Sequence, residues 1–309
     1  MSECAFFSRC LAFFILSTQT RYTRCARIRH SHSLPGADPF NEFPYCPRES
    51  RNTRMKITPP FGYDEIVPLQ KQHRVLLPAG STPAFCRNIN ALAVSVSEFA
   101  TAGRDYPIVF ISLDQGSTFA PVIVLGLAAG SNLFLGENGD WDVACYLPAF
   151  VRRYPFCISK LYVDGEPKGE RLVCVAKAYL DPAGVSLFDE AENPTPQWQS
   201  VERLLSEYEA DLDLTTQMCV AFSRMHLFEP FTMQVMRQDA PEVKLAGMYR
   251  IDATRLNDLK PANQKIMVAK GYMGCVYAHL HSLQNFARLY AREATRTSNT
   301  APSYSDSLR

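Results

Sequence analysis

The sequence lacks the local motifs by which the common classes of enzyme are recognised. It contains no G-x-S-x-G nucleophile elbow, and the glycines of GLAAG at 126–130 have neither the P-loop lysine nor the Rossmann spacing. Its ten cysteines are scattered, without a CxxC pair or a Cys–His spacing typical of a metal site. The sequence therefore predicts no cofactor and no metal, and the catalytic residues, if any, are unknown.

Long apolar runs and a surplus of charge are also missing. The nearest candidate for a membrane span, Ala5–Ser17, is interrupted by Arg9 and is shorter than the roughly 18 residues that a spanning helix needs. The formal net charge is +1, so nothing favours a nucleic-acid partner. Scattered cysteines in a chain of this size indicate reduced, buried thiols and therefore the cytoplasm.

Residues 1–54 differ from the rest of the chain because arginines and turn formers alternate there without an amphipathic period. A poor signal peptide and a basic arm are two interpretations. A third is that translation begins at Met55, where normal alternation starts. We expect 1–54 to be a disordered or mis-annotated extension, 55–294 to be a single domain, and the Ser- and Thr-rich tail at 295–309 to be disordered.

Apolar runs of strand length predominate in the first half of the chain. PIVFISL at 107–113 and PVIVLGL at 121–127 are rich in Val and Ile and are typical of strands buried on both faces. Shorter runs predict strands at 66–69, 73–77, 91–96 and 132–135, and a hairpin of 156–163 with 171–176.

Two long amphipathic helices are predicted in the second half. Thr195 is a suitable N-cap with Pro196 at the first helical position, and apolar residues recur every three or four positions from Val201 to Met225. A second helix is predicted from Tyr272 to about Ala291, with His281, Asn285, Arg288 and Arg292 on a polar stripe.

The order of these elements favours an α+β fold. It would have a mixed or antiparallel sheet in the N-terminal half, and two long amphipathic helices with a late hairpin, 232–236 with 243–251, in the C-terminal half.

The segment WDVACYLPAFVRRYPF at 141–156 combines aromatic residues with the adjacent Arg152 and Arg153. With Tyr146 and Tyr154 these guanidiniums could bind a phosphate or a carboxylate. The alternative is an internal salt bridge plus a solvated neighbour, because adjacent residues of a strand point to opposite faces.

Two further polar groups are candidates for ligand binding. Arg104 and Asp105 precede a buried strand and either line a site at its mouth or cap the preceding turn. His281 and Asn285 share one face of the last helix, and a solvated helix face is the alternative. His279 and His281 are two positions apart on this helix, so they cannot bind one metal together.

Four stretches resemble the SapC family of bacterial proteins. They are YPIVF at 106–110, YLPAFVRRYPF at 146–156, LFD at 187–189, and His279-Leu280 with Ser282-Leu283 and Asn285-Phe286. The resemblance covers roughly 60–291. An unrelated peptide-transporter permease has the same name, but this sequence has no run that could form its membrane spans.

The family is named after a protein encoded beside the secretion apparatus of a bacterial surface layer. The resemblance therefore implies a non-enzymatic accessory role in surface-layer export or outer-membrane transport, with an envelope or secretion-system protein as partner and an exported, envelope-associated location as the alternative to the cytoplasm. It brings no catalytic residues. The alternative function is an enzyme that acts on an anionic small molecule or envelope component through an Arg/Asp/His site.

Overall fold

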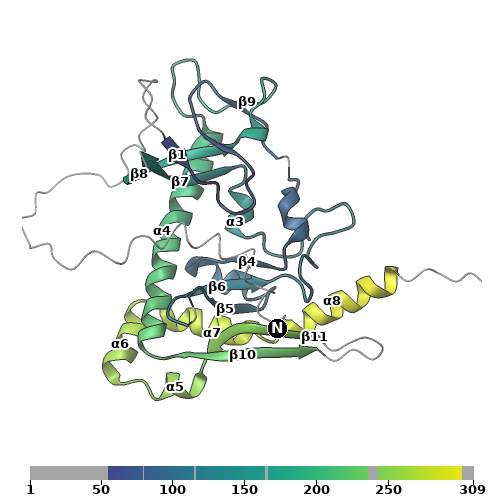
Figure 1. Cartoon of the computed structure of the whole chain (residues 1–309), viewed down its shortest axis with the longest axis vertical. Helices are drawn as coiled ribbons and strands as arrows, with labels where there is room; N and C mark the ends of the chain where they lie inside the picture. Colours follow the sequence, from purple (N-terminus) through teal and green to yellow (C-terminus); the bar gives the residue numbers. More distant parts are fainter. Residues whose placement is uncertain (1–54, 79, 115, 164–165, 236–242, 301–309) are drawn as a thin grey trace, which may run out of the picture. The chain divides into compact units, whose positions relative to one another are not determined.

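The computed structural model describes residues 55–300, except 79, 115, 164–165 and 236–242 (Figure 1). Within this range the tertiary contacts divide the chain into two compact units. The first contains 80–152 and 208–300, and the second contains 55–79 and 153–207. The single domain predicted for 55–294 stays a prediction. The expected disorder at 1–54 and 301–309 lies outside the described residues.

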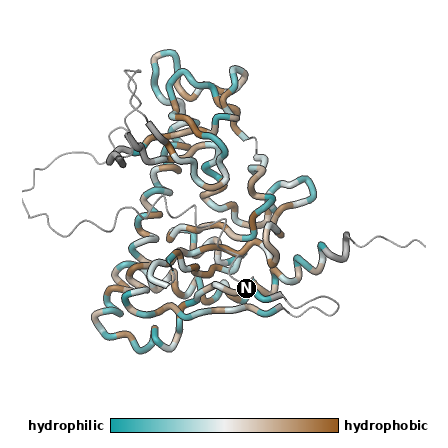
Figure 2. The backbone as a smooth tube through the Cα atoms, viewed as in Figure 1, coloured by the Kyte–Doolittle hydropathy of each residue, from teal (hydrophilic) through white to brown (hydrophobic). Residues whose placement is uncertain are grey.

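A five-stranded antiparallel sheet with the order β10-β11-β5-β6-β4 forms the centre of the first unit (Figure 1). Its strands are β4 (Ala91–Ala93), β5 (Ile108–Ser112), β6 (Phe119–Val124), β10 (Phe228–Val235) and β11 (Val243–Ile251). Ile108, Val109 and Phe110 of the middle strand are fully buried. The continuous apolar runs thus correctly predicted two buried strands, and Figure 2 shows hydrophobic residues concentrated along them.

Helices complete the first unit. They are η1 (Ala84–Asn88), η2 (Val96–Glu98), α2 (Phe99–Ala102), α3 (Ala149–Arg152), α5 (Ala253–Asn257), α6 (Pro261–Ala269), α7 (Tyr272–Ser282), α8 (Asn285–Thr300) and the second part of α4 (Pro196–Arg224). The helix expected from Tyr272 is therefore two helices. The second continues to Thr300, past the boundary at 294 where a tail was expected.

The second unit contains two antiparallel sheets, β1-β7-β8-β2 and β3-β9. Its elements are β1 (Met55–Ile57), β2 (Ile66–Pro68), β3 (Arg74–Val75), β7 (Phe156–Val163), β8 (Glu166–Ala176), η3 (Lys177–Tyr179), β9 (Val185–Ser186) and the first part of α4. Trp198 of α4 is fully buried against Phe156 and Phe188. The Thr195 hydroxyl accepts from the Trp198 N–H at 3.3 Å, which confirms the predicted N-cap.

These elements confirm the α+β fold class, and every strand pair within the described residues is antiparallel. Two local predictions were wrong. Residues 132–135 form only an isolated bridge, Leu135 with Trp141, rather than a strand. Arg152 ends the short helix α3 rather than following a strand, because the Pro148 carbonyl accepts from the N–H groups of Val151 and Arg152.

The buried face of α7 includes two polar side chains, His279 and Ser282. His279 is fully buried, its Nε2 accepts from the Ile251 N–H at 3.1 Å, and its Nδ1 lies 2.8 Å from the Ile108 carbonyl. The first contact requires an unprotonated Nε2, so the second is an Nδ1–H donor and the ring is neutral. Ser282 donates to the His279 carbonyl and accepts from the Ile108 N–H at 2.9 Å. His279 thereby joins α7 to both β5 and β11.

The burial of His279 predicts that stability falls in acid. Burial lowers the pKa of His279 to about 4, so below pH 6.5 the unfolded chain binds a proton that the folded chain excludes. Stability is retained above the unfolded pKa and is lost as the pH falls from 6.5 towards 4, by roughly 2 kcal/mol at pH 5. Urea unfolding at pH 7 and pH 5 measures this loss.

His279→Gln should remove this component of the pH dependence, whereas His281→Gln, at an exposed position of the same helix, should retain it. An equal pH dependence in wild type and His279→Gln would contradict the prediction.

Candidate functional site

The segment Trp141–Arg152 belongs to the first unit, and side chains from elsewhere in that unit hold it. The Trp141 N–H donates to Thr82 Oγ1 at 2.7 Å, and its indole Nε1–H donates to the Tyr106 hydroxyl at 2.9 Å. The Tyr106 hydroxyl in turn donates to the Tyr146 carbonyl. Burial raises the pKa of Tyr106 well above its ordinary value, so this phenol stays a donor at neutral pH.

Tyr146 makes a hydrogen bond through each of its polar atoms. Its N–H donates to Asp105 Oδ2 at 2.8 Å, and its hydroxyl donates to Glu98 Oε1 at 3.0 Å. Burial, aided by the Glu98 carboxylate, raises the pKa of Tyr146 to about 12. Arg152 Nη2 donates to the same hydroxyl at 3.0 Å. Tyr146 thus joins Asp105, Glu98 and Arg152.

Glu98 is a buried carboxylate with four donors. Oε1 accepts from the Ala149 N–H at 2.7 Å as well as from Tyr146. Oε2 accepts from the N–H and the hydroxyl of Ser95, at 2.9 and 2.8 Å. The contact from the Ser95 N–H is one half of the capping box of η2, and the Ser95 side chain accepts from the Glu98 N–H in the other half. Glu98 was not among the residues predicted for the site, although the S-x-x-E pattern at 95–98 is a capping-box signal that could have identified it.

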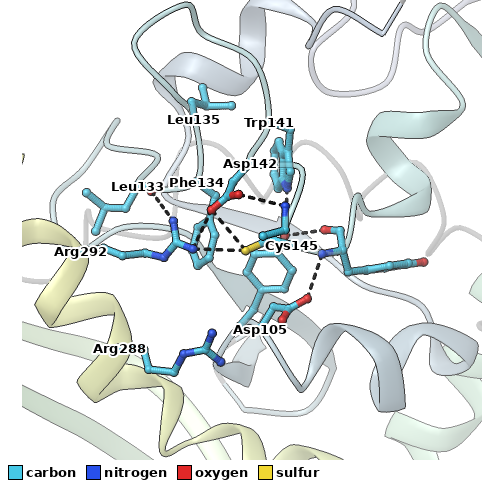
Figure 3. Close-up of polar contacts among 12 residues, drawn as sticks. Asp105, Leu133, Phe134, Leu135, Trp141, Asp142, Cys145, Arg288 and Arg292 are labelled. Carbon is cyan, nitrogen blue, oxygen red and sulfur yellow. Dashed lines mark hydrogen bonds and ion pairs between the residues drawn. The ribbon is translucent and has the colours of Figure 1, made fainter.

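Arg292 of α8 holds the other end of the segment (Figure 3). Its Nη2 contacts Asp142 Oδ2 at 2.8 Å and Cys145 Sγ at 3.2 Å, and the guanidinium lies 4.5 Å from the centre of the Phe134 ring. Hydrogen bonding from Arg292 lowers the pKa of Asp142. Burial raises the pKa of Cys145 to about 11, so Cys145 is a protonated thiol at neutral pH.

Asn285 and Arg288 of α8 hold the turn before β5. Asn285 Nδ2 donates to the carbonyls of Gly103 and Tyr106, at 2.9 and 3.2 Å. Arg288 Nη1 donates to the Arg104 carbonyl at 2.7 Å and to Asn285 Oδ1 at 3.3 Å. Asn285 and Arg288 of the predicted polar stripe therefore contact the protein's own main chain.

The structure brings together only some of the candidate ligand-binding residues. Asp105, Tyr146 and Arg152 form one hydrogen-bonded chain. Arg104 and Asn285 are linked through Arg288. His281 is exposed, and among the described residues its side chain makes no hydrogen bond.

Arg153 and Tyr154 belong to the second unit, whereas Arg152 belongs to the first. Arg153 is buried, with its guanidinium 5.9 Å from the centre of the Tyr63 ring, and Tyr154 packs on Tyr63 at 4.9 Å. Arg152 is exposed. The two adjacent guanidiniums thus have different environments. A shared role of all eight candidates in ligand binding stays a prediction.

No three His, Cys, Asp or Glu side chains in the described parts of the chain are placed to hold a metal ion. No helix between residues 55 and 300, apart from the gaps noted above, has the length and apolar character of a membrane span.

The SapC family model matches residues 70–289, which is most of the chain and includes η2, the turn before β5 and the 141–152 segment, but not Arg292 of α8. The chain belongs to the SapC family. No curated protein and no solved structure matches it. Within this SapC member, the 141–152 segment is a rigidly held loop that ends in α3, with its polar atoms bonded to side chains from η2, the turn before β5 and α8.

Replacing Glu98 by glutamine should destabilise the protein by about 1–3 kcal/mol. Each carboxylate oxygen accepts from one main-chain N–H, so the amide NH₂ of glutamine would face a main-chain donor in either orientation. Denaturant unfolding measures the change. Glu137→Gln, at an exposed position, is the control and should leave stability within about 0.5 kcal/mol of wild type. A similar small effect of Glu98→Gln would contradict the assigned role.

Proposed function

We propose that this protein is a non-enzymatic accessory protein of surface-layer export or outer-membrane transport, located in the cytoplasm, that acts by binding an envelope or secretion-system protein. Its membership of the SapC family supports this role. The binding surface would be the loop at 142–145 together with the adjoining face of α8.

The observation that carries the proposal is the contrast between fixed and exposed groups in this loop. Asp142 and Cys145 are both held by Arg292, while Val143 between them is fully exposed and Ala144 is exposed as well. A rigid main chain that displays an apolar side chain suits recognition, because little entropy remains to be lost on binding.

The same contacts weigh against the alternative, an enzyme acting on an anionic small molecule. Asp105 and Glu98 accept main-chain N–H groups, and Arg288 and Arg292 donate to main-chain carbonyls. A catalytic site would need such groups directed at a substrate rather than at the protein itself.

Co-purification from the native bacterium, followed by mass spectrometry, tests the proposed function. We expect wild type to recover an envelope or secretion component, and Val143→Asp to lose it by at least about tenfold, because a charge replaces an apolar contact. Val268→Asp is the matched control, since Val268 is an exposed valine on α6 of the same unit. It should recover the component as wild type does.

If wild type recovers no envelope or secretion component, the proposed role is wrong. Equal recovery by Val143→Asp and Val268→Asp would show that the loop is not the binding surface.

A further inference from the structure

Near the exposed loop, two guanidiniums carry hydrogen-bond donors that have no acceptor in the described part of the chain. Arg288 uses only Nη1, and Arg104 makes a single long contact, from Nε to the Thr101 carbonyl at 3.5 Å. Both side chains are exposed, and neither forms an ion pair among the described residues. Within the described residues, Arg288 Nε and Nη2 and both Nη atoms of Arg104 therefore have no acceptor.

These two arginines are neighbours in the structure. Arg288 Nη1 lies 2.7 Å from the Arg104 carbonyl, so the two residues are in direct contact although the chain separates them widely. Figure 3 shows Arg288 and Arg292 projecting from the same helix towards the segments that carry Asp105 and Asp142. Arg292 is already paired with Asp142. The donors without an acceptor thus belong to Arg104 and Arg288, which lie close together.

The charge of this group matches a single carboxylate. Arg104, Arg288 and Arg292 contribute three positive charges, and Asp105 and Asp142 contribute two negative charges, which leaves a net charge of +1. Arg296 and Glu293, on the next turn of α8, add one charge of each sign. A single carboxylate would neutralise this remaining positive charge.

From these observations we infer that the face formed by Arg104, Arg288 and the 142–145 loop binds an acidic peptide segment of a protein partner. A glutamate or aspartate carboxylate accepts from the unused guanidinium donors, and a neighbouring apolar residue of the same segment contacts Val143. Planar guanidiniums suit carboxylates because two N–H groups can donate to the two oxygens in parallel. The inference rests on the proposed function and names the chemistry of its partner.

Fluorescence anisotropy with the full chain tests this inference. The probe is a labelled peptide in which glutamates are interspersed with leucine and alanine. Two matched peptides carry glutamine or phosphoserine in place of glutamate. We expect wild type to bind the glutamate peptide with an affinity that falls as salt is added, and to bind the glutamine peptide at least about tenfold more weakly.

Arg288→Gln should weaken binding of the glutamate peptide by at least about tenfold. The control is Arg87→Gln. Arg87 is also exposed, contacts one main-chain carbonyl, that of Asn138 at 3.2 Å, and makes no ion pair among the described residues. It should bind as wild type does. Thermal unfolding of each variant confirms that the proteins compared are folded.

Three results would overturn the inference. They are no binding of the glutamate peptide by wild type, equal loss in Arg87→Gln and Arg288→Gln, or tighter binding of the phosphoserine peptide. Co-purification with Arg288→Gln separates this inference from the proposed function. If that variant still recovers the envelope component, the acidic-segment inference is wrong and the accessory role stands. If wild type recovers none, the role itself fails.

Discussion

A buried carboxylate persists in a folded protein only if hydrogen-bond donors replace the water that it has lost, and Glu98 meets this constraint with four donors. Two come from Ser95 and fix η2. The other two come from Tyr146 and Ala149, about fifty residues later. Glu98 therefore fixes the position of Tyr146 and of the start of α3 against η2. Tyr146 extends the same network to Asp105, so the turn before β5 and the 141–152 segment share one set of hydrogen bonds.

The same constraint explains the polar face of α7 and α8. His279, Ser282 and Asn285 are buried, and each bonds to main-chain atoms at or just before the start of β5. Arg292 continues this face to the 132–145 loop. Polar residues spaced three or four apart thus hydrogen-bond α7 and α8 to the chain around the start of β5 and so align both helices with the central sheet. Arg288 is exposed and, among the described residues, uses only its Nη1.

Strands made of continuous apolar residues and the capped start of a helix could be predicted from the sequence. The contacts that polar side chains make with distant parts of the chain could not. The runs at 107–113 and 121–127 gave β5 and β6, and the Thr195-Pro196 start gave α4, because continuous apolarity and capping are local signals. The stripe containing His281 and Asn285 has the same spacing as a solvated face, so spacing could not reveal that Asn285 is buried while His281 is exposed. Of the candidate site, the sequence identified Asp105, Tyr146 and Arg152, but not Glu98, which accepts from the Tyr146 hydroxyl.

Rigidity and recognition are separable within the 142–145 loop. Arg292 fixes Asp142 and Cys145, so the conformational entropy of the loop is lost on folding and does not oppose binding. Val143 lies between Asp142 and Cys145 in the sequence. It has no packing role, because its side chain is fully exposed. A residue that contributes nothing to the core can change while Asp142 and Cys145 stay in place. Under the proposed function, the loop would therefore vary in what it binds without any change in the fold that presents it.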